Sequence, residues 1–251
     1  MLTVKNLSYD INQQYIIEEI NFTVSPGEVL CLLGPNGAGK TTIIKCINQI
    51  YQPSQGWINV DGQNIFEFNR KEIASRIAYI PQEQNTAFSY SVLEFTVMGF
   101  APHLNWWDKP AAQEYQHALE QLKELGISHL HDRQFNNLSG GEKQLVLLAR
   151  TLIQDSDYLL MDEPISHLDF KNQHLLLNKL LDLAHNKSKG IIITLHDPNL
   201  ARRFSHKSVI ISEGKVIKKG NSKEIVNHKN LEEAYRVLIE PKPGEAFYPM
   251  V

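Results

Sequence analysis

A glycine-rich stretch near the start of the chain carries residue types that can hold phosphate. GPNGAGKTT, from Gly34 to Thr42, fits the pattern G-x-x-x-x-G-K-[ST] and lies between an apolar run and a helical pattern. Glycines at this spacing let backbone N–H groups close around phosphate oxygens, while Lys40 reaches the terminal phosphates and the Thr41 hydroxyl ligates Mg²⁺. The stretch therefore predicts a Walker A loop that binds a nucleoside triphosphate through Gly34, Pro35, Asn36, Gly37, Ala38, Gly39, Lys40, Thr41 and Thr42.

Two adjacent carboxylates end a second apolar run, YLLMDEP, from Tyr158 to Pro164. Acids at the end of a buried strand usually need a cation to balance their charge. The pattern predicts that Asp162 holds Mg²⁺ through water, and that Glu163 orients and deprotonates the attacking water.

Three single polar residues follow other predicted strands. They are Gln82 in IPQEQ, Asp169 in SHLDF and His196 in TLHDP. A single residue of these types is more often structural than catalytic. Their interpretation as site residues therefore depends on their position, because the strands that precede them are expected to end near the same phosphates.

The stretch NNLSGGEKQLVLLAR, from Asn136 to Arg150, predicts a second phosphate-binding site. Ser139, Gly140 and Gly141 come directly before a helical pattern of apolar residues. The start of a helix with small residues favours an anion, because free backbone N–H groups and a partial positive charge converge there.

The elements that must position these residues are those of an α/β protein. Short strands at the N-terminus predict an antiparallel β part, and later strands alternate with helical segments, as in a mostly parallel sheet. The segment from about Gln82 to Asn137 predicts helices without a strand between them. We therefore expect a P-loop NTPase core over residues 1–81 and 138–240, a helical subdomain over 82–137 and a tail over 241–251.

Composition limits the class of protein. The chain has 251 residues, and its net charge of -3 gives no basic field that would favour nucleic acid. Cys31 and Cys46 lie in apolar runs without metal-binding or disulfide spacing, which indicates a reducing compartment. No signal peptide, lipid anchor or run of about 18 apolar residues is evident. These features predict a soluble, intracellular protein.

Taken together, these motifs resemble those of the ATP-binding cassette (ABC) ATPases, and the resemblance covers nearly the whole chain. LSGGEKQ, Leu138 to Gln144, is similar to the signature motif of that family, which other P-loop NTPases such as small-molecule kinases lack. The resemblance implies that two copies pack head to tail around ATP and Mg²⁺. Ser139, Gly140 and Gly141 would then hold the γ-phosphate of the ATP bound to the partner chain.

The resemblance also implies a role for each remaining residue. Glu163 would be the catalytic base, and His196 would hold the γ-phosphate and the attacking water. Gln82 would contact Mg²⁺ or water and sense the membrane partner, while Asp169 would shape the interface between the two copies.

Two positions differ from the usual family pattern. Ile11 stands where an aromatic residue commonly stacks on adenine, which leaves Tyr9 and Tyr15 as the candidates for that contact. Ile165 replaces the more usual threonine after the proline of YLLMDEP.

A single cassette without a membrane span resembles the ATPase subunit of a transporter with separate membrane subunits. SVLEFTVMGFAPHLNWW, SHLDFKNQ and LHDPNLA resemble importers of iron-siderophore, haem and cobalamin chelates, although Phe100 and Pro198 depart from that subgroup. Importers of molybdate and other oxyanions, exporters and non-transport cassettes remain alternatives. The resemblance implies two permease subunits as direct partners and a substrate-binding protein as an indirect one. It places the chain peripherally at the cytoplasmic face of the cell membrane.

Four aromatic residues after Gln82 have two interpretations. Phe88, Tyr90, Trp106 and Trp107 can line a cleft that receives a short helix of the membrane subunit, or they can fill the core of the helical insertion.

Overall fold

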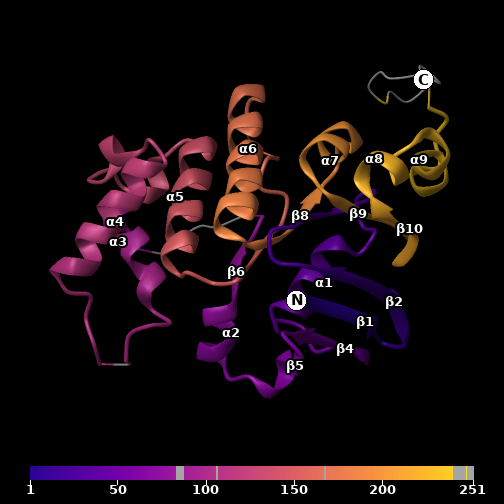
Figure 1. Ribbon diagram of the computed structural model, residues 1–251, viewed down its shortest axis with the longest axis horizontal. Helices are drawn as coiled ribbons and strands as arrows, with labels where there is room; N and C mark the ends of the chain where they lie inside the picture. Colours follow the sequence, from indigo (N-terminus) through magenta and orange to yellow (C-terminus); the bar gives the residue numbers. More distant parts are fainter. Residues whose placement is uncertain (83–87, 106, 167, 240–246, 248–251) are drawn as a thin grey trace.

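A computed structural model describes residues 1–82, 88–105, 107–166, 168–239 and 247 of the chain. It contains two β-sheets with helices around them, and a group of helices at one end of the molecule (Figure 1). No helix in these described ranges is long and apolar enough to cross a lipid bilayer.

The central sheet has six strands in the order β10-β9-β3-β8-β7-β6. All neighbouring strands are parallel except β10, which pairs with β9 in the antiparallel sense. The residues of β3, β7 and β8 are all buried, as expected for parallel strands that are covered on both faces. The mostly parallel sheet of the predicted fold is therefore confirmed. The strands are β3 (Val29–Leu33), β6 (Ile77–Ile80), β7 (Tyr158–Met161), β8 (Gly190–Leu195), β9 (Lys207–Ser212) and β10 (Lys215–Asn221).

The N-terminal part forms the predicted antiparallel sheet, in the order β2-β1-β4-β5. Its strands are β1 (Leu2–Ile11), β2 (Gln14–Val24), β4 (Gln55–Val60) and β5 (Gln63–Asn64). Successive side chains of a strand point to opposite faces, so Leu30 and Leu32 of β3 join the core shared with this sheet, while Cys31 and Leu33 join the core on the other face.

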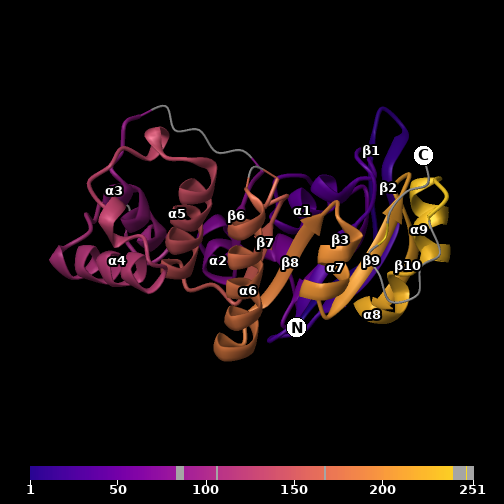
Figure 2. The same cartoon turned by 90° about the horizontal axis from the view of Figure 1, so that it is seen from above.

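Helices cover both faces of the central sheet (Figure 2). Residues of α1 (Lys40–Ile47) belong to the core shared with the antiparallel sheet. Residues of α6 (Phe170–Lys187), α7 (Pro198–Phe204) and α9 (His228–Tyr235) belong to the core on the opposite face. The remaining helices of this part are η1 (Ile65–Glu67), α2 (Arg70–Arg76) and α8 (Ser222–Ile225).

The segment between β6 and β7 is helical, as the sequence predicts, and its described residues form no named strand. It contains α3 (Val92–Val97), η2 (Met98–Phe100), α4 (Ala112–Glu124), η3 (Ser128–Leu130), η4 (Phe135–Asn137) and α5 (Gly140–Ile153). Helix α5 packs against α3 and α4. The turn η2 also packs closely on α5, because a Cβ added to Gly99 would meet the carbonyl of Arg150 and the side chain of Ile153. The division of the chain at residues 82 and 137 stays a prediction.

Candidate active site

A cavity of about 870 Å³ collects residues from across the sequence. It lies at the carboxyl ends of four parallel strands, because Gly34 follows β3, Gln82 follows β6, Glu163 follows β7 and His196 follows β8. Open α/β sheets bind ligands at this edge. The lining residues are Ile16, Pro35, Asn36, Gly37, Ala38, Gly39, Lys40, Thr41, Thr42, Gln82, Glu163, His196 and Tyr235.

The loop from Gly34 to Gly39 connects buried β3 to α1. Gly39 is the residue before the helix and has φ of 97°, a left-handed conformation that glycine adopts without strain. The Lys40 ammonium donates hydrogen bonds to the carbonyl oxygens of Gly34 at 2.7 Å and Pro35 at 2.8 Å. Burial lowers the pKa of Lys40, while the charges of Glu163 and Asp162 act in the opposite direction. The loop therefore has the form of a phosphate cradle with a buried cation at its base.

A buried threonine connects the two carboxylate residues that follow β7. The Thr194 hydroxyl donates to Oδ1 of Asp162 at 2.8 Å and accepts from the backbone N–H of Glu163 at 2.7 Å. Both Asp162 and Thr194 are almost completely buried. Glu163 itself has φ of 47°, a left-handed conformation that is uncommon for a residue with a side chain. Thr194 therefore holds the backbone turn that presents Glu163 to the cavity.

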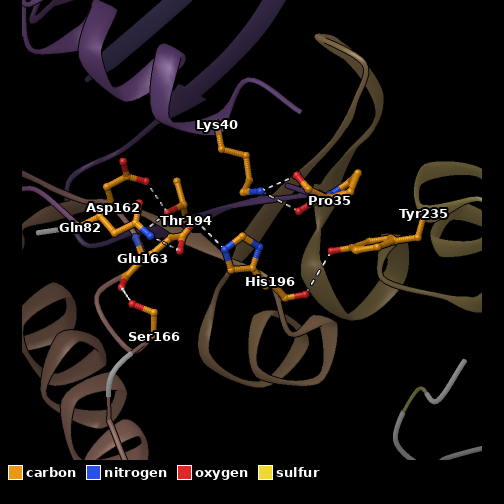
Figure 3. A network of polar contacts seen from close by, with 10 residues as sticks. Pro35, Lys40, Gln82, Asp162, Glu163, Ser166, Thr194, His196 and Tyr235 are labelled. Atoms are coloured by element: carbon orange, nitrogen blue, oxygen red, sulfur yellow. Dashed lines mark hydrogen bonds and ion pairs between the residues drawn. The ribbon is translucent and has the colours of Figure 1, made fainter. Parts of the chain in front are cut away.

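The carboxylate of Glu163 has a side-chain partner on each oxygen (Figure 3). The Gln82 amide donates to Oε2 at 2.8 Å, and Nε2 of His196 lies 2.6 Å from Oε1. The structure thus brings together three residues that the sequence placed at one site from separate strands. In this arrangement, a carboxylate that can accept a proton faces the lysine of the phosphate cradle.

The signature stretch forms a capped helix start that does not line this cavity. Ser139 is the N-cap of α5, and its N–H and hydroxyl donate to Oε2 of Glu142 at 2.8 Å and 2.7 Å. These bonds from Ser139 hold the pKa of Glu142 below its usual value. Asp169 caps α6 by accepting from the backbone N–H of Asn172 at 2.8 Å, and the Asn172 side chain lies against Gly141. The starts of α5 and α6 are therefore neighbours, outside the cavity of their own chain.

The two tyrosines considered for adenine contact do not line the cavity. The Tyr9 ring stacks on Tyr51 with a centroid separation of 5.0 Å, and the Tyr15 hydroxyl accepts a hydrogen bond from Gln55 at 3.0 Å. Ile16 lines the cavity instead. Ile16 lies between Tyr15 and the buried Ile17 of β2, and nothing in its residue type or spacing predicts a place in a ligand cavity.

Thr194 and Tyr235 are two further residues that sequence reasoning missed. A hydroxyl inside the otherwise apolar strand GIIITL is a signal that could have identified Thr194. Tyr235 comes from the distant helix α9 and had no comparable signal.

Comparison with known proteins agrees with this geometry. The sequence model of the family described as ABC transporter matches residues 17–166. The chain belongs to the ABC transporter family. As an ABC ATPase, it binds and hydrolyses ATP.

Relatives of this ABC ATPase match along nearly their full length. The "probable iron chelatin transport ATP-binding protein" of Helicobacter pylori is 37% identical, with 96% of this chain and 94% of the relative covered. A molybdate import ATP-binding protein of Haemophilus influenzae is 33% identical, with coverage of 92% and 86%. A solved structure of a metal-chelate type ABC transporter in an inward-facing conformation has a TM-score of 0.86 at 31% identity, covering 100% of this chain and 97% of that one.

Proposed function

We propose that this ABC ATPase hydrolyses ATP with Glu163 as the general base, at sites that form between two copies of the chain. The observation that carries the proposal is the position of Glu163, which faces the Lys40 cradle while Gln82 and His196 contact its two oxygens. A carboxylate in this position can accept a proton from water that attacks the γ-phosphorus, while the bond from that phosphorus to the oxygen of the leaving ADP breaks. His196 would exchange Glu163 for the γ-phosphate as the nucleotide enters.

The oxygen-bearing residues beside the cradle fit Mg²⁺. Thr41 lines the cavity, Asp162 is buried beside it, and Gln82 follows β6 at the same edge. Hydroxyl, carboxylate and amide oxygens are the ligands that Mg²⁺ prefers, and the ion usually keeps several waters. Among the described residues, no group of three or more His, Cys, Asp or Glu side chains is placed to hold a metal. Bound Mg²⁺ would neutralise charge on the β- and γ-phosphates.

The second phosphate site belongs, in this proposal, to the partner's nucleotide. Ser139, Gly140 and Gly141 begin a helix of 14 residues and do not line the cavity of their own chain. A helix start favours an anion, so a partner copy packed head to tail would have its γ-phosphate clamped between two such starts. Asp169, beside the signature through Asn172, would lie at the same interface.

The direct membrane partners would be two permease subunits. A groove of about 710 Å³ lies between α2 and the segment that follows α3. Most of its lining residues are apolar, among them Met98, Leu104 and Trp107, and the charged ones are Arg70, Lys71 and Asp108. A mostly apolar lining with a few charged side chains suits a short amphipathic helix. We propose this groove as the docking site, at the cytoplasmic face of the cell membrane, with a substrate-binding protein as an indirect partner.

The described residues of the predicted aromatic cleft do not all line the same groove. Trp107 lines the groove and is 80% exposed, whereas Tyr90 packs against the main core. The Phe88 ring lies edge-on to Tyr90, and neither of these two residues lines the groove. Trp106 lies outside the described residues.

Import of a metal chelate is the transport function that the relatives favour. Both the iron chelatin relative and the metal-chelate type transporter cover the chain almost completely. Import of molybdate is the second candidate, because the Haemophilus relative is nearly as similar over most of its length. The cassette contacts the nucleotide and the permease, so the cargo is selected by other subunits.

An uptake assay tests the function and separates the two cargoes. A deletion strain would receive the wild-type gene, the Glu163→Gln gene or a Tyr158→Phe control, and uptake of labelled ferric chelates and molybdate would be measured. We expect wild type and the control to restore ferric chelate uptake and Glu163→Gln to fail. Restoration of molybdate uptake alone would favour the second cargo, and full activity of Glu163→Gln would reject the role of the base.

A further inference from the structure

Tyr235, the last residue of α9, reaches the active-site cavity from the C-terminal part of the chain. Its hydroxyl donates a hydrogen bond to the backbone carbonyl oxygen of His196 at 3.2 Å (Figure 3), and Tyr235 is one of the residues that line the cavity. Burial raises the pKa of the Tyr235 phenol well above its usual value, whereas the backbone amide of Gly34 acts in the opposite direction. The hydroxyl therefore stays protonated and lies close to both the His196 loop and the start of the phosphate cradle.

The bond acts on a peptide group that the sheet does not hold. His196 comes after the last residue of β8, and Asp197 already caps α7. The peptide between these two residues is therefore part of a short turn, and its orientation restrains the backbone of His196 from which the imidazole extends. A hydrogen bond to the His196 carbonyl restrains that peptide and so limits the positions that the imidazole can take, both beside Glu163, where Nε2 lies 2.6 Å from Oε1, and after the proposed exchange of Glu163 for the γ-phosphate.

Tyr235 is itself held on the same central sheet. The Ser212 hydroxyl, at the end of β9, donates to the carbonyl of the neighbouring Ala234 at 2.8 Å. Helix α9 ends at once, because Arg236 adopts a left-handed conformation with φ of 56° and its N–H bonds back to the Glu232 carbonyl at 2.8 Å. Strand β9 pairs with β3, which leads into the cradle, so Tyr235 has a fixed place relative to Gly34.

We propose that Tyr235 is a positioning residue for ATP hydrolysis, which fixes His196 relative to Glu163 and the phosphate cradle through its hydroxyl. This inference rests on the proposed role of His196. It assigns a function to a residue of α9, a helix that is distant in the sequence from every motif of the site. Because the hydroxyl acts through His196, its removal should slow the chemical step and leave the binding of ATP intact.

The variant Tyr235→Phe tests the proposal because it keeps the ring that lines the cavity and removes only the hydroxyl. We expect kcat to fall by about 3- to 10-fold, which is the effect expected from the loss of one hydrogen bond. KM and the Kd for ATP should change by less than about twofold. The matched control is Tyr158→Phe, since Tyr158 is a buried tyrosine whose hydroxyl lies 3.5 Å from Asp61, outside the cavity. It should keep the wild-type kcat.

A double-mutant cycle separates positioning from a general structural effect. In the His196→Ala background, Tyr235→Phe should cause no further loss in the single-turnover rate, because the group it positions is gone. A loss of equal size in both backgrounds, or a wild-type kcat for Tyr235→Phe, would overturn the proposal.

A measurement that does not depend on activity completes the test. NMR of histidine-labelled protein should show a shifted or broadened His196 ring signal in Tyr235→Phe, and an unchanged signal would count against the proposal. The proposed function fails separately, if Glu163→Gln and His196→Ala both hydrolyse ATP at the wild-type rate. If those two variants are impaired and Tyr235→Phe is not, only the inference about Tyr235 fails.

Discussion

Nε2 of His196 lies 2.6 Å from Oε1 of Glu163, so the two side chains proposed to act on the γ-phosphate and the water contact each other directly. Gln82 occupies the other oxygen of the same carboxylate at 2.8 Å. In the proposed mechanism, entry of the nucleotide would rearrange both contacts before Glu163 could accept a proton from water. In that mechanism, the chemical step would depend on the presence of the γ-phosphate.

Glu163→Gln should bind ATP and form a stable dimer but hydrolyse slowly. The amide keeps the size of the carboxylate and cannot accept the proton, so we expect the steady-state rate to fall by about 10²–10⁴-fold. Phosphate release and gel filtration with and without ATP measure the two properties. A hydrolysis rate near that of wild type would contradict the assignment of the base.

Mixing two inactive variants should restore hydrolysis if each site is built from two chains. Ser139→Arg disables the signature and Glu163→Gln disables the base, so a mixed dimer has one site in which both parts are intact. With random pairing, a 1:1 mixture should regain up to about a quarter of the wild-type rate, as expected for a symmetric head-to-tail pair. Each variant alone is the control, and a mixture that stays inactive would argue for sites made within one chain.

Thr194→Val should impair hydrolysis although Thr194 has no place in the cavity wall. Valine has the same shape but leaves the Glu163 N–H and one oxygen of Asp162 without their partner, which costs about 1–3 kcal/mol for a buried group. We expect a drop in kcat of about tenfold, measured by phosphate release, with a lower midpoint in urea. Thr194→Ser keeps the hydroxyl and should restore most of the rate. Equal rates for the valine and serine variants would rule out this role.

The contact with adenine is testable through Ile16 and Tyr15. Ile16 lines the cavity, so Ile16→Ala should raise the Kd for ATP by about 3- to 10-fold through lost apolar contact, and should leave the Kd for tripolyphosphate unchanged. Tyr15→Ala is the comparison. A larger effect of Tyr15→Ala would support the prediction that this tyrosine stacks on the base.

The two thiols should make stability fall in alkaline solution. Burial raises the pKa of Cys31 and of Cys46 from 9.0 to about 12, so above pH 9 the unfolded chain loses protons that the folded chain keeps. The contribution is complete below pH 9 and is lost as the pH rises towards 12, by at most about 1.4 kcal/mol per pH unit for each thiol. Urea unfolding at pH 8 and pH 10 measures it. Cys31→Ala/Cys46→Ala should lose less stability over this range than wild type, and an equal loss would contradict the prediction.

The parts of the site that the sequence predicted are those encoded by local spacing. The loop from Gly34 to Thr42 and the pair Asp162–Glu163 are recognisable in the sequence, because each motif lies within a few residues of the strand that positions it. The parallel sheet and the antiparallel N-terminal sheet followed from the periodicity of apolar residues in the same way.

The residues that escaped prediction act across the fold. Thr194 meets Glu163 only because β8 and β7 are neighbours, and Tyr235 meets His196 only because α9 packs on β9. Ile16 reaches the cavity because β2 passes close to Gly39. Strand order and helix packing are long-range properties, so the residues that each of these side chains contacts could not be read from a local pattern in one sequence.

If the proposed groove receives the permease, the close packing of Gly99 on α5 would connect that groove mechanically to the signature at the other end of the helix. Gly99 lies next to Met98 in the proposed docking groove and touches the last turns of α5, whose other end carries Ser139. A helix of 14 residues is about 21 Å long, and it transmits a push along its axis with little compression. A bulkier residue at position 99 would force η2 away from α5. A displacement of the groove would then no longer reach Ser139 at the start of α5.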